Sequence, residues 1–263
     1  MKQDERASFD RALDAARRVA YPPGEFVGQE SFMRAQEIRA LAVRAGIGPG
    51  ASVLDLCCGV AGPGRFVTAE LGCTYLGVDS SVSAIAIARQ RAAGLPCRFE
   101  AGRVPPVPPG AFDVVLLLET MLAFADKRTL LREISSALPL GGRFAFTVEE
   151  GQPLTQAERQ LMPDADTVWL IPLPRLVSLL ELAGFRVGWT EECSAAHRET
   201  ADSLVGAFDA DRSAIAAEVG ERALEELMTA HRLWSDWLSK GRVRKFAAVA
   251  EKIGDAADGE LPG

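Results

Sequence analysis

The sequence has few of the features that mark secreted, metal-binding or membrane proteins. It has two histidines, and its cysteines are odd in number and lack the paired CxxC spacing of a structural zinc site. We therefore expect reduced thiols in a cytoplasmic protein, and no metal. The N-terminus has no apolar run, and no stretch reaches the ~18 apolar residues of a membrane span. The cysteines are Cys57, Cys58, Cys73, Cys97 and Cys193.

The sequence also lacks an excess of basic residues. Its net charge is −7 and its pI is about 5.1, whereas an enzyme acting on nucleic acid needs a basic track that neutralises phosphates. One local cluster, Lys240, Arg242, Arg244 and Lys245, predicts a solvated turn that enters a strand. We expect a small-molecule substrate as the partner, no nucleic acid, no membrane, and a monomer or a homodimer.

The sequence does show a regular alternation of strand-like and helical segments from residue 52 to residue 150. This order predicts a parallel sheet with helices on both faces. The segment 112–119, FDVVLLLE, is almost wholly apolar, which is typical of a central strand covered on both sides. The expected strands are 52–57, 74–79, 97–102, 112–119 and 143–150, and the expected helices are 63–72, 81–94 and 126–138.

Helical segments flank this alternating region. Apolar residues recur at helical spacing in 4–20 and 30–46. After residue 150 we expect a helix at 172–185 and strands at 185–193 and 243–252, with mainly helical sequence between these two strands. The predicted organisation is an N-terminal helical arm or lid (1–46), an α/β domain (47–194 plus 242–252) and a helical cap insert (195–241).

The most informative segment is 53–66, VLDLCCGVAGPGRF. A strand carrying Asp55 leads into a loop of small residues, and a helix begins near Pro63. Small residues let a ligand approach the backbone, and a helix N-terminus offers free amides. The second strand ends in Asp79, an acid that can accept hydrogen bonds from both hydroxyls of a ribose.

The same loop distinguishes S-adenosylmethionine from a dinucleotide. A dinucleotide loop reads GxGxxG and holds a pyrophosphate, but the glycines here are Gly59, Gly62 and Gly64. The carboxylate of Asp55 repels a pyrophosphate, whereas it can help to hold the ammonium group of S-adenosylmethionine. The loop therefore favours the methyl donor.

In these segments the sequence resembles the class I, Rossmann-like S-adenosylmethionine-dependent methyltransferases, in particular their small-molecule branch. Residues 53–66 are similar to the first motif of that family, GVDSS (77–81) to its acidic ribose element, and ALPLGGRFAFT (137–147) to its turn and fifth strand. The resemblance implies a doubly wound α/β fold. Its seven-strand, mostly parallel sheet has the order 3-2-1-4-5-7-6, with the last strand antiparallel.

The resemblance also implies S-adenosylmethionine as the cofactor, with S-adenosylhomocysteine as the product. Cys57 and Ala61 stand where the family usually has glycine, and both are small. Tyr21 is expected to close over the cofactor from the arm. The candidate cofactor-binding residues are Asp55, Cys57, Gly59, Ala61, Asp79, Ser80, Glu119, Thr120 and Tyr21.

Two side chains are candidates for catalytic proton transfer. His231 shares a helix face with Trp234, so it could take a proton from an acceptor if the cap roofs the site. The alternative is a histidine packed among aromatic residues. Glu149 ends the fifth strand and could face the substrate; its alternative is a solvated charged turn.

The function expected from these features is methyl transfer to the oxygen, nitrogen or carbon of a small organic acceptor, with specialised metabolism as one setting. Two alternatives stay open. One is a cyclase or isomerase that binds S-adenosylmethionine on the same fold without methylating. The other is a nicotinamide-dependent oxidoreductase.

Overall fold

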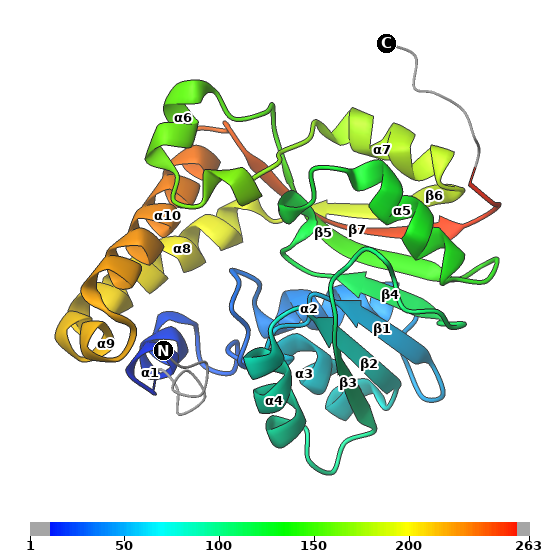
Figure 1. Cartoon of the computed structure of the whole chain (residues 1–263), viewed down its shortest axis with the longest axis horizontal. Coiled ribbons are helices and arrows are strands. Elements are labelled where there is room, and N and C mark those ends of the chain that lie inside the picture. Colours follow the sequence, from blue (N-terminus) through cyan, green and yellow to red (C-terminus); the bar gives the residue numbers. More distant parts are fainter. Residues whose placement is uncertain (1–10, 257–263) are drawn as a thin grey trace.

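The computed structural model describes residues 11–256 (Figure 1). The predicted helix at 4–20 therefore lies partly outside the described residues, and the described part is α1 (Arg11–Ala20). None of the described helices combines the length and the apolar character needed to cross a bilayer.

Seven strands form one sheet in the order β3-β2-β1-β4-β5-β7-β6, which confirms the predicted topology. β7 runs antiparallel to both β5 and β6, whereas the other neighbouring strands are parallel. The strands are β1 (Ser52–Leu56), β2 (Thr74–Asp79), β3 (Cys97–Ala101), β4 (Val114–Leu117), β5 (Arg143–Glu150), β6 (Phe185–Glu192) and β7 (Arg244–Lys252).

The sheet is covered on both faces, and β4 shows why its sequence is apolar throughout. Alternate residues of a strand point to opposite faces. Val114 and Leu116 pack into one apolar cluster with α2 (Ala35–Arg44), α3 (Gly62–Leu71) and α4 (Val82–Arg91). Val115 and Leu117 pack into a second cluster with α5 (Lys127–Ser136) and α7 (Leu173–Leu182).

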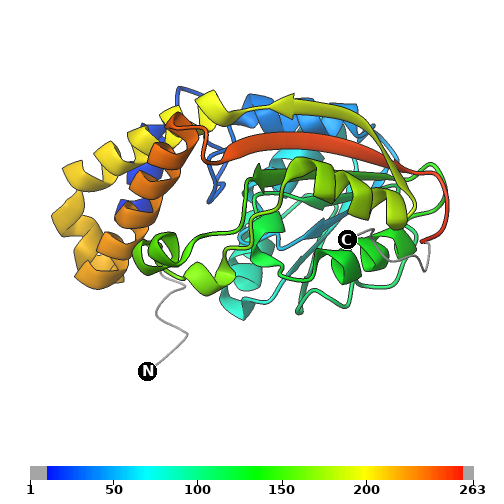
Figure 2. The ribbon, with the colours of Figure 1, turned by 90° about the horizontal axis from the view of Figure 1, so that it is seen from above.

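Three helices, α8 (Ser194–Ala210), α9 (Arg212–Val219) and α10 (Glu221–Ser239), stand beside the sheet (Figures 1 and 2). They share an apolar cluster with α1, in which Leu13 packs with Phe208 and Met228. Helix α2, by contrast, packs on the sheet. The N-terminal segment therefore contributes α1 to the group of helices α8–α10, and α2 to the layer of helices on the sheet.

Helix α2 begins at Ala35 and not at the predicted residue 30. The buried side chain of Gln29 accepts from the Val27 N–H and donates to the carbonyls of Glu25 and Met33, which fixes this stretch as a loop. The carboxylate of Glu37 accepts a hydrogen bond from the Arg34 N–H at 2.7 Å and so caps the helix.

Three short helices were not predicted: α6 (Gln156–Leu161) and the 3₁₀ helices η2 (Met121–Ala123) and η3 (Ala165–Thr167). α6 is too short for its apolar residues to show a helical period. Its start does carry a signal, because Thr155 and Glu158 form a reciprocal capping box.

Candidate active site

A cavity of about 270 Å³ opens where β1, β2 and β4 end. Ligands of open α/β sheets bind at this carboxyl edge. Its walls come from the loop after β1, from Asp79, from the turn after β4 and from the arm segment 28–31. Six of the predicted cofactor-binding residues line it: Asp55, Cys57, Gly59, Asp79, Glu119 and Thr120.

The other three predicted cofactor-binding residues lie outside this wall. Ala61 is fully buried at the start of α3, and Ser80 is exposed. Tyr21 is buried, and its hydroxyl donates to the carbonyl of Ser31, which does line the cavity. Tyr21 therefore supports the arm loop from outside the cavity wall.

The loops around the cavity hold residues in strained backbone conformations. Cys57 (φ 59°), Ala61 (φ 57°) and Glu119 (φ 60°) are left-handed, although none is glycine. Such conformations are costly and persist only where the surroundings impose them, most often at functional sites. The backbone at Cys57 thus adopts the glycine-like conformation that the family resemblance implies for this position.

The arm packs directly against residues 57–64, the loop after β1 and the start of α3, which we call the glycine loop. A Cβ atom placed on Gly62 would lie 2.3 Å from the carbonyl of Gly28, a separation that real Cβ atoms do not adopt. Only glycine therefore allows the arm to pack this closely against the start of α3. This contact brings the arm segment 28–31 into the cavity wall.

Asp55 is almost wholly buried at the end of β1. Burial, together with the charge of Asp79, raises its pKa to about 7, and a hydrogen bond from the Tyr75 hydroxyl opposes the rise. The carboxyl group is therefore balanced between its neutral and ionised forms near neutral pH. A cation in the cavity would favour the ionised form.

Asp79 organises the loop after β1. One of its oxygens accepts from the Gly59 N–H at 2.9 Å, and the other accepts from the Ser81 N–H at 2.8 Å. A carboxylate has about four acceptor positions. Each oxygen of Asp79 can therefore accept one more hydrogen bond, which leaves capacity for a diol.

A buried charge network extends from the cavity into the sheet. The Lys245 ammonium lies 2.7 Å from the carboxylate of Glu119 and also donates to Glu149. Burial acts to raise the pKa of Glu119, but Lys245 and His197 outweigh it and the pKa is lowered. Burial prevails for Glu149, whose pKa is raised despite Lys245. The pKa values of the two acids that share Lys245 are thus shifted in opposite directions.

Two buried oxygens beside this network have no hydrogen-bond partner. They are Oγ1 of Thr120, which lines the cavity, and Oε2 of Glu149. Buried polar atoms are nearly always satisfied. The Thr120 oxygen, which lies on the cavity wall, is therefore available to the polar groups of a ligand.

The prediction of a solvated turn at 240–245 is wrong for Lys245, because only 2% of the surface of this residue is exposed. In the β5–β7 pairing Lys245 lies opposite Glu149, and Arg244 lies opposite Glu150. One pair points inward and the other outward, because neighbouring residues of a strand face opposite ways. The sequence does carry a signal for the buried pair. The acids 149–150 and the basic residues 244–245 occur in two strands that the family resemblance makes antiparallel neighbours.

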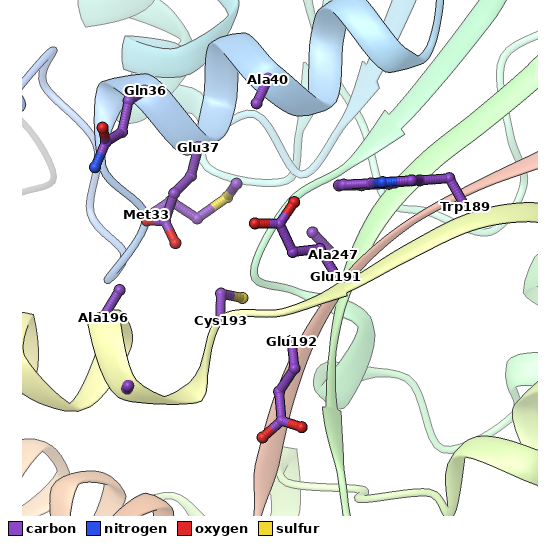
Figure 3. A pocket seen from close by; sticks show the side chains of 11 residues that line it. Met33, Gln36, Glu37, Ala40, Trp189, Glu191, Glu192, Cys193, Ala196 and Ala247 are labelled. Atoms are coloured by element: carbon purple, nitrogen blue, oxygen red, sulfur yellow. The ribbon is translucent and has the colours of Figure 1, made fainter.

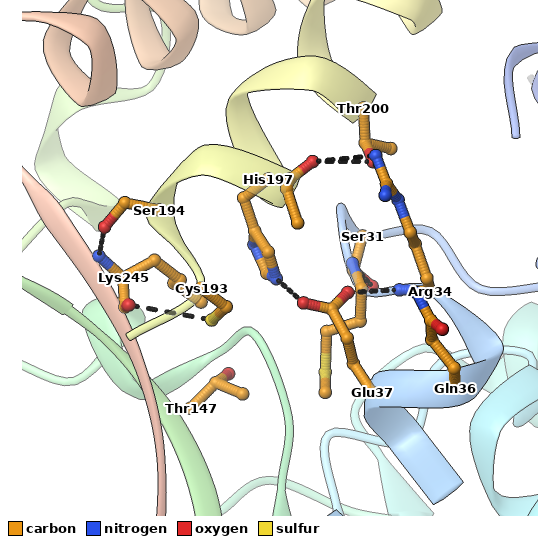
Figure 4. Close-up of polar contacts among 12 residues, drawn as sticks. Ser31, Arg34, Gln36, Glu37, Thr147, Cys193, Ser194, His197, Thr200 and Lys245 are labelled. Atoms are coloured by element: carbon orange, nitrogen blue, oxygen red, sulfur yellow. Dashed lines mark hydrogen bonds and ion pairs between the residues drawn. The ribbon is translucent and has the colours of Figure 1, made fainter. Parts of the chain in front are cut away.

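The network reaches two more residues that the sequence did not connect, Glu37 and His197 (Figure 4). Nε2 of His197 lies 3.5 Å from Glu37, and Nδ1 lies 3.8 Å from Glu119. His197 is fully buried, yet neither ring nitrogen has a hydrogen-bond partner.

His231 lies in the cap and is not among the residues that line the 270 Å³ cavity. Its Nδ1 lies 2.7 Å from the Leu227 carbonyl, and its ring packs edge-on against Phe32 and Phe208. Burial lowers its pKa to about 4, so the ring is neutral near pH 7. Trp234 packs against Trp237 instead.

Residues 53–142 match the family described as "Methyltransferase domain". The matched segment spans β1 to the turn before β5, and thus includes the glycine loop, Asp79 and Glu119.

Among curated proteins, phosphoethanolamine N-methyltransferase 1 of Arabidopsis thaliana is 34% identical over 99 residues. This match covers 36% of the chain and only 20% of that relative. The similarity therefore concerns the segment that holds the cavity, not the whole length of that relative.

Two solved structures resemble the chain over most of its length. The Haemonchus contortus phosphoethanolamine N-methyltransferase 2, in complex with phosphomonomethylethanolamine and S-adenosylhomocysteine, has a TM-score of 0.76 at 18% identity; the match covers 96% of this chain and 60% of that one. The [4+2]-cyclase SpnF has a TM-score of 0.72 at 18% identity, with 94% and 92% covered. At this identity the likeness concerns the fold.

Proposed function

Because the chain belongs to the class I, Rossmann-like S-adenosylmethionine-dependent methyltransferases, we propose that it transfers a methyl group to a small organic acceptor. The observation that carries this proposal is the 270 Å³ cavity, which joins Asp55 and Asp79 to the turn at Glu119 and Thr120. The acceptor atom is oxygen, nitrogen or carbon.

The residues of the cavity fit S-adenosylmethionine. Asp79 keeps two acceptor positions for a ribose diol, Asp55 can pair with an ammonium group, and Thr120 offers an unpartnered hydroxyl oxygen. Gly59 leaves room near the backbone of the loop, because the nearest atom to an added Cβ is Oε2 of Glu30 at 3.8 Å. When bound, the cofactor supplies an electrophilic methyl group on a sulfonium.

The contribution of the chain is to align the reactants and to exclude water. Alignment of reacting groups can be worth about 7–11 kcal/mol. The arm segment 28–31 lines one side of the cavity and Glu119 lines another. The arm 1–46 and the cap 195–241 act as the lid and the acceptor pocket in this proposal.

Two side chains are the proposed proton acceptors. The unpartnered Oε2 of Glu149 lies beside Lys245, which is itself in contact with the cavity residue Glu119. His231 is neutral near pH 7 and bonds through Nδ1 to a carbonyl, so its Nε2 can accept a proton. A base is required only when the acceptor must first lose a proton.

Three measurements test the proposal. Calorimetry with S-adenosylhomocysteine should show saturable binding to one site per chain, and absence of such heat at sub-millimolar ligand counts against it. Incubation of S-adenosylmethionine with a panel of amines, phenols and carbon acids should give a product heavier by one methylene. Glu149→Gln should slow the reaction more than Glu150→Gln, because Glu150 pairs with Arg244 outside the buried network.

A non-methylating cyclase or isomerase is the second candidate. The fold likeness to a [4+2]-cyclase over 94% of the chain favours it, and one fold can host unrelated reactions. Product mass separates the two candidates, since cyclisation or isomerisation leaves the mass of the substrate unchanged.

The proposed location is the cytoplasm. All five cysteines are free thiols, and burial raises the pKa of Cys57 to about 12. Unreactive free thiols are typical of proteins in a reducing compartment.

A further inference from the structure

A second cavity, of about 460 Å³, lies between α2, the end of β6 and the start of α8. Its wall includes the side chains of Glu37 and Cys193 (Figure 3). His197 follows one helical turn after Cys193 and is completely buried. One donor atom from each of these three residues lies within 4.8 Å of the other two.

His197 is the second, independent indication of a ligand. Both ring nitrogens are buried and neither has a hydrogen-bond partner. The nearest acceptors, on Glu37 and Glu119, lie 3.5 Å and 3.8 Å away, which is longer than a normal hydrogen bond. A buried imidazole is rarely left without a partner, and a bound metal ion is one partner that would satisfy it.

We propose that Glu37, Cys193 and His197 bind one zinc ion. Carboxylate, thiolate and imidazole are the three ligand types that zinc takes in proteins. With Nε2 on the metal, Nδ1–H faces Glu119, which reproduces the carboxylate–histidine–metal arrangement that orients metal-bound imidazoles. Three protein ligands leave further positions open to water or to a ligand in the 460 Å³ cavity, which also gives the ion a path of entry.

The contacts of each ligand agree with this role. Oε2 of Glu37 caps α2 through the Arg34 N–H, so Oε1 is the oxygen that faces His197. The Cys193 thiol donates a hydrogen bond of 3.6 Å to the Lys245 carbonyl. When the ion binds, this thiol gives up its proton to solvent and the sulfur forms the bond to zinc.

The charges of the surroundings also favour a cation. The carboxylates of Glu37, Glu119 and Glu149 lie around a single lysine, Lys245, and around His197. With three carboxylates and one lysine, this buried cluster has an excess of acidic side chains. A divalent ion reduces that excess, which otherwise costs free energy in a buried setting.

The proposed ion joins parts of the chain that only folding brings together. Glu37 belongs to α2, which packs on the sheet, and His197 belongs to the cap helix α8. Glu119 connects the ion to the wall of the 270 Å³ cavity. Zinc would therefore hold the cap against the sheet next to the active site.

The test uses tag-free full-length protein that has been stripped with a chelator and titrated with Co²⁺. A thiolate–cobalt charge-transfer band should appear with one Co²⁺ per chain, and Zn²⁺ should displace it. Cys193→Ser should abolish the band, and His197→Ala and Glu37→Gln should each weaken binding at least tenfold. Absence of the band, or an equal band in Cys193→Ser, overturns the proposal.

Matched controls come from the same chain. Cys97→Ser removes a half-buried thiol from β3, and Glu199→Gln removes a carboxylate from α8 that pairs with Arg34; both should bind Co²⁺ as the wild type does, and loss of the band in Cys97→Ser also overturns the proposal. Zn²⁺ should raise the melting temperature of the wild type, a readout that needs no variant to fold; no rise argues against the site. Calorimetry with S-adenosylhomocysteine on stripped protein tests the proposed function separately.

Discussion

The hydroxyl of Tyr75 donates a hydrogen bond of 2.5 Å to the carboxylate of Asp55. The bond ties the acid at the end of β1 to the neighbouring strand β2, beneath the glycine loop. A Cβ on Gly64 would lie 2.1 Å from the Tyr75 ring, so this glycine makes room for the tyrosine. The bond also opposes the rise in the pKa of Asp55 that burial causes.

Cofactor affinity should therefore depend on pH through Asp55. The pKa of about 7 lies above the ordinary value, so acid neutralises the group, and a cationic ligand binds best to the ionised form. Affinity for S-adenosylhomocysteine should fall by up to roughly tenfold per pH unit below pH 7 and level off above it. Calorimetry at a series of pH values measures this.

Two variants test whether Asp55 causes this pH dependence. Tyr75→Phe removes the hydrogen bond that lowers the pKa of Asp55, so the inflection should move to higher pH. Asp55→Asn should remove the pH dependence of the affinity. A wild-type affinity that does not change between pH 5 and pH 8 would contradict the assignment.

Asp79→Ala should weaken binding of S-adenosylhomocysteine about 10- to 100-fold, because a hydrogen bond to a charged group contributes about 1.5–3 kcal/mol. The control is Asp126→Ala. Asp126 caps α5 through the Thr129 N–H, so this variant should lose about 1 kcal/mol of stability and keep its affinity. Equal affinities for Asp79→Ala and the wild type would exclude Asp79 as the ribose ligand.

Lys245→Met should destabilise the fold by about 3–5 kcal/mol, because it leaves Glu119 and Glu149 buried without their cation. Arg244→Met, one residue earlier on β7, breaks half-exposed pairs with Glu150 and Glu192 and a contact with the Phe246 ring, and should cost less than Lys245→Met. Urea unfolding compares the two. If both variants lose a similar free energy of unfolding, the buried contacts of Lys245 stabilise the fold no more than the exposed contacts of Arg244.

Gly62→Ala should displace the arm, since its Cβ meets the backbone of Gly28. Affinity for S-adenosylhomocysteine should fall, and proteolysis within the arm segment 21–34 should become faster. Gly206→Ala is the control: nothing lies within 4 Å of its Cβ position in α8, and alanine in a helix is about 1 kcal/mol more favourable than glycine. An unchanged proteolysis rate in Gly62→Ala would refute the role of this contact.

The alternation of the sequence was enough to predict the strands, the faces they bury and, through the family resemblance, their order. The apolar run of β4 and the glycine loop are local signals, so they can be recognised without the fold. Where local rules competed, the prediction failed. Residues 30–34 have a helical pattern, but the hydrogen bonds of Gln29 hold part of this stretch as a loop, and helix α2 starts only after it.

The glycine loop with Asp55, Asp79, Glu119 and Thr120 was predicted from the sequence because each residue lies in the last part of a strand or just after it, and these strand ends meet at the same sheet edge. The pKa of Asp55 was not readable, since it depends on burial and on Tyr75 from another strand. Lys245 was misjudged for the same reason. Its surroundings come from Glu119 and Glu149, about a hundred residues away.

The Cys193–His197 spacing places both side chains on one helix face, but their proposed third partner, Glu37, belongs to the arm. Residue type, period and order are properties of the chain, and they determined the fold class and the position of the glycine loop. Desolvation and the pairing of distant charges depend on which surfaces are brought together. Only the tertiary structure could decide which acids keep their protons, which lysine is buried and where the cap meets the sheet.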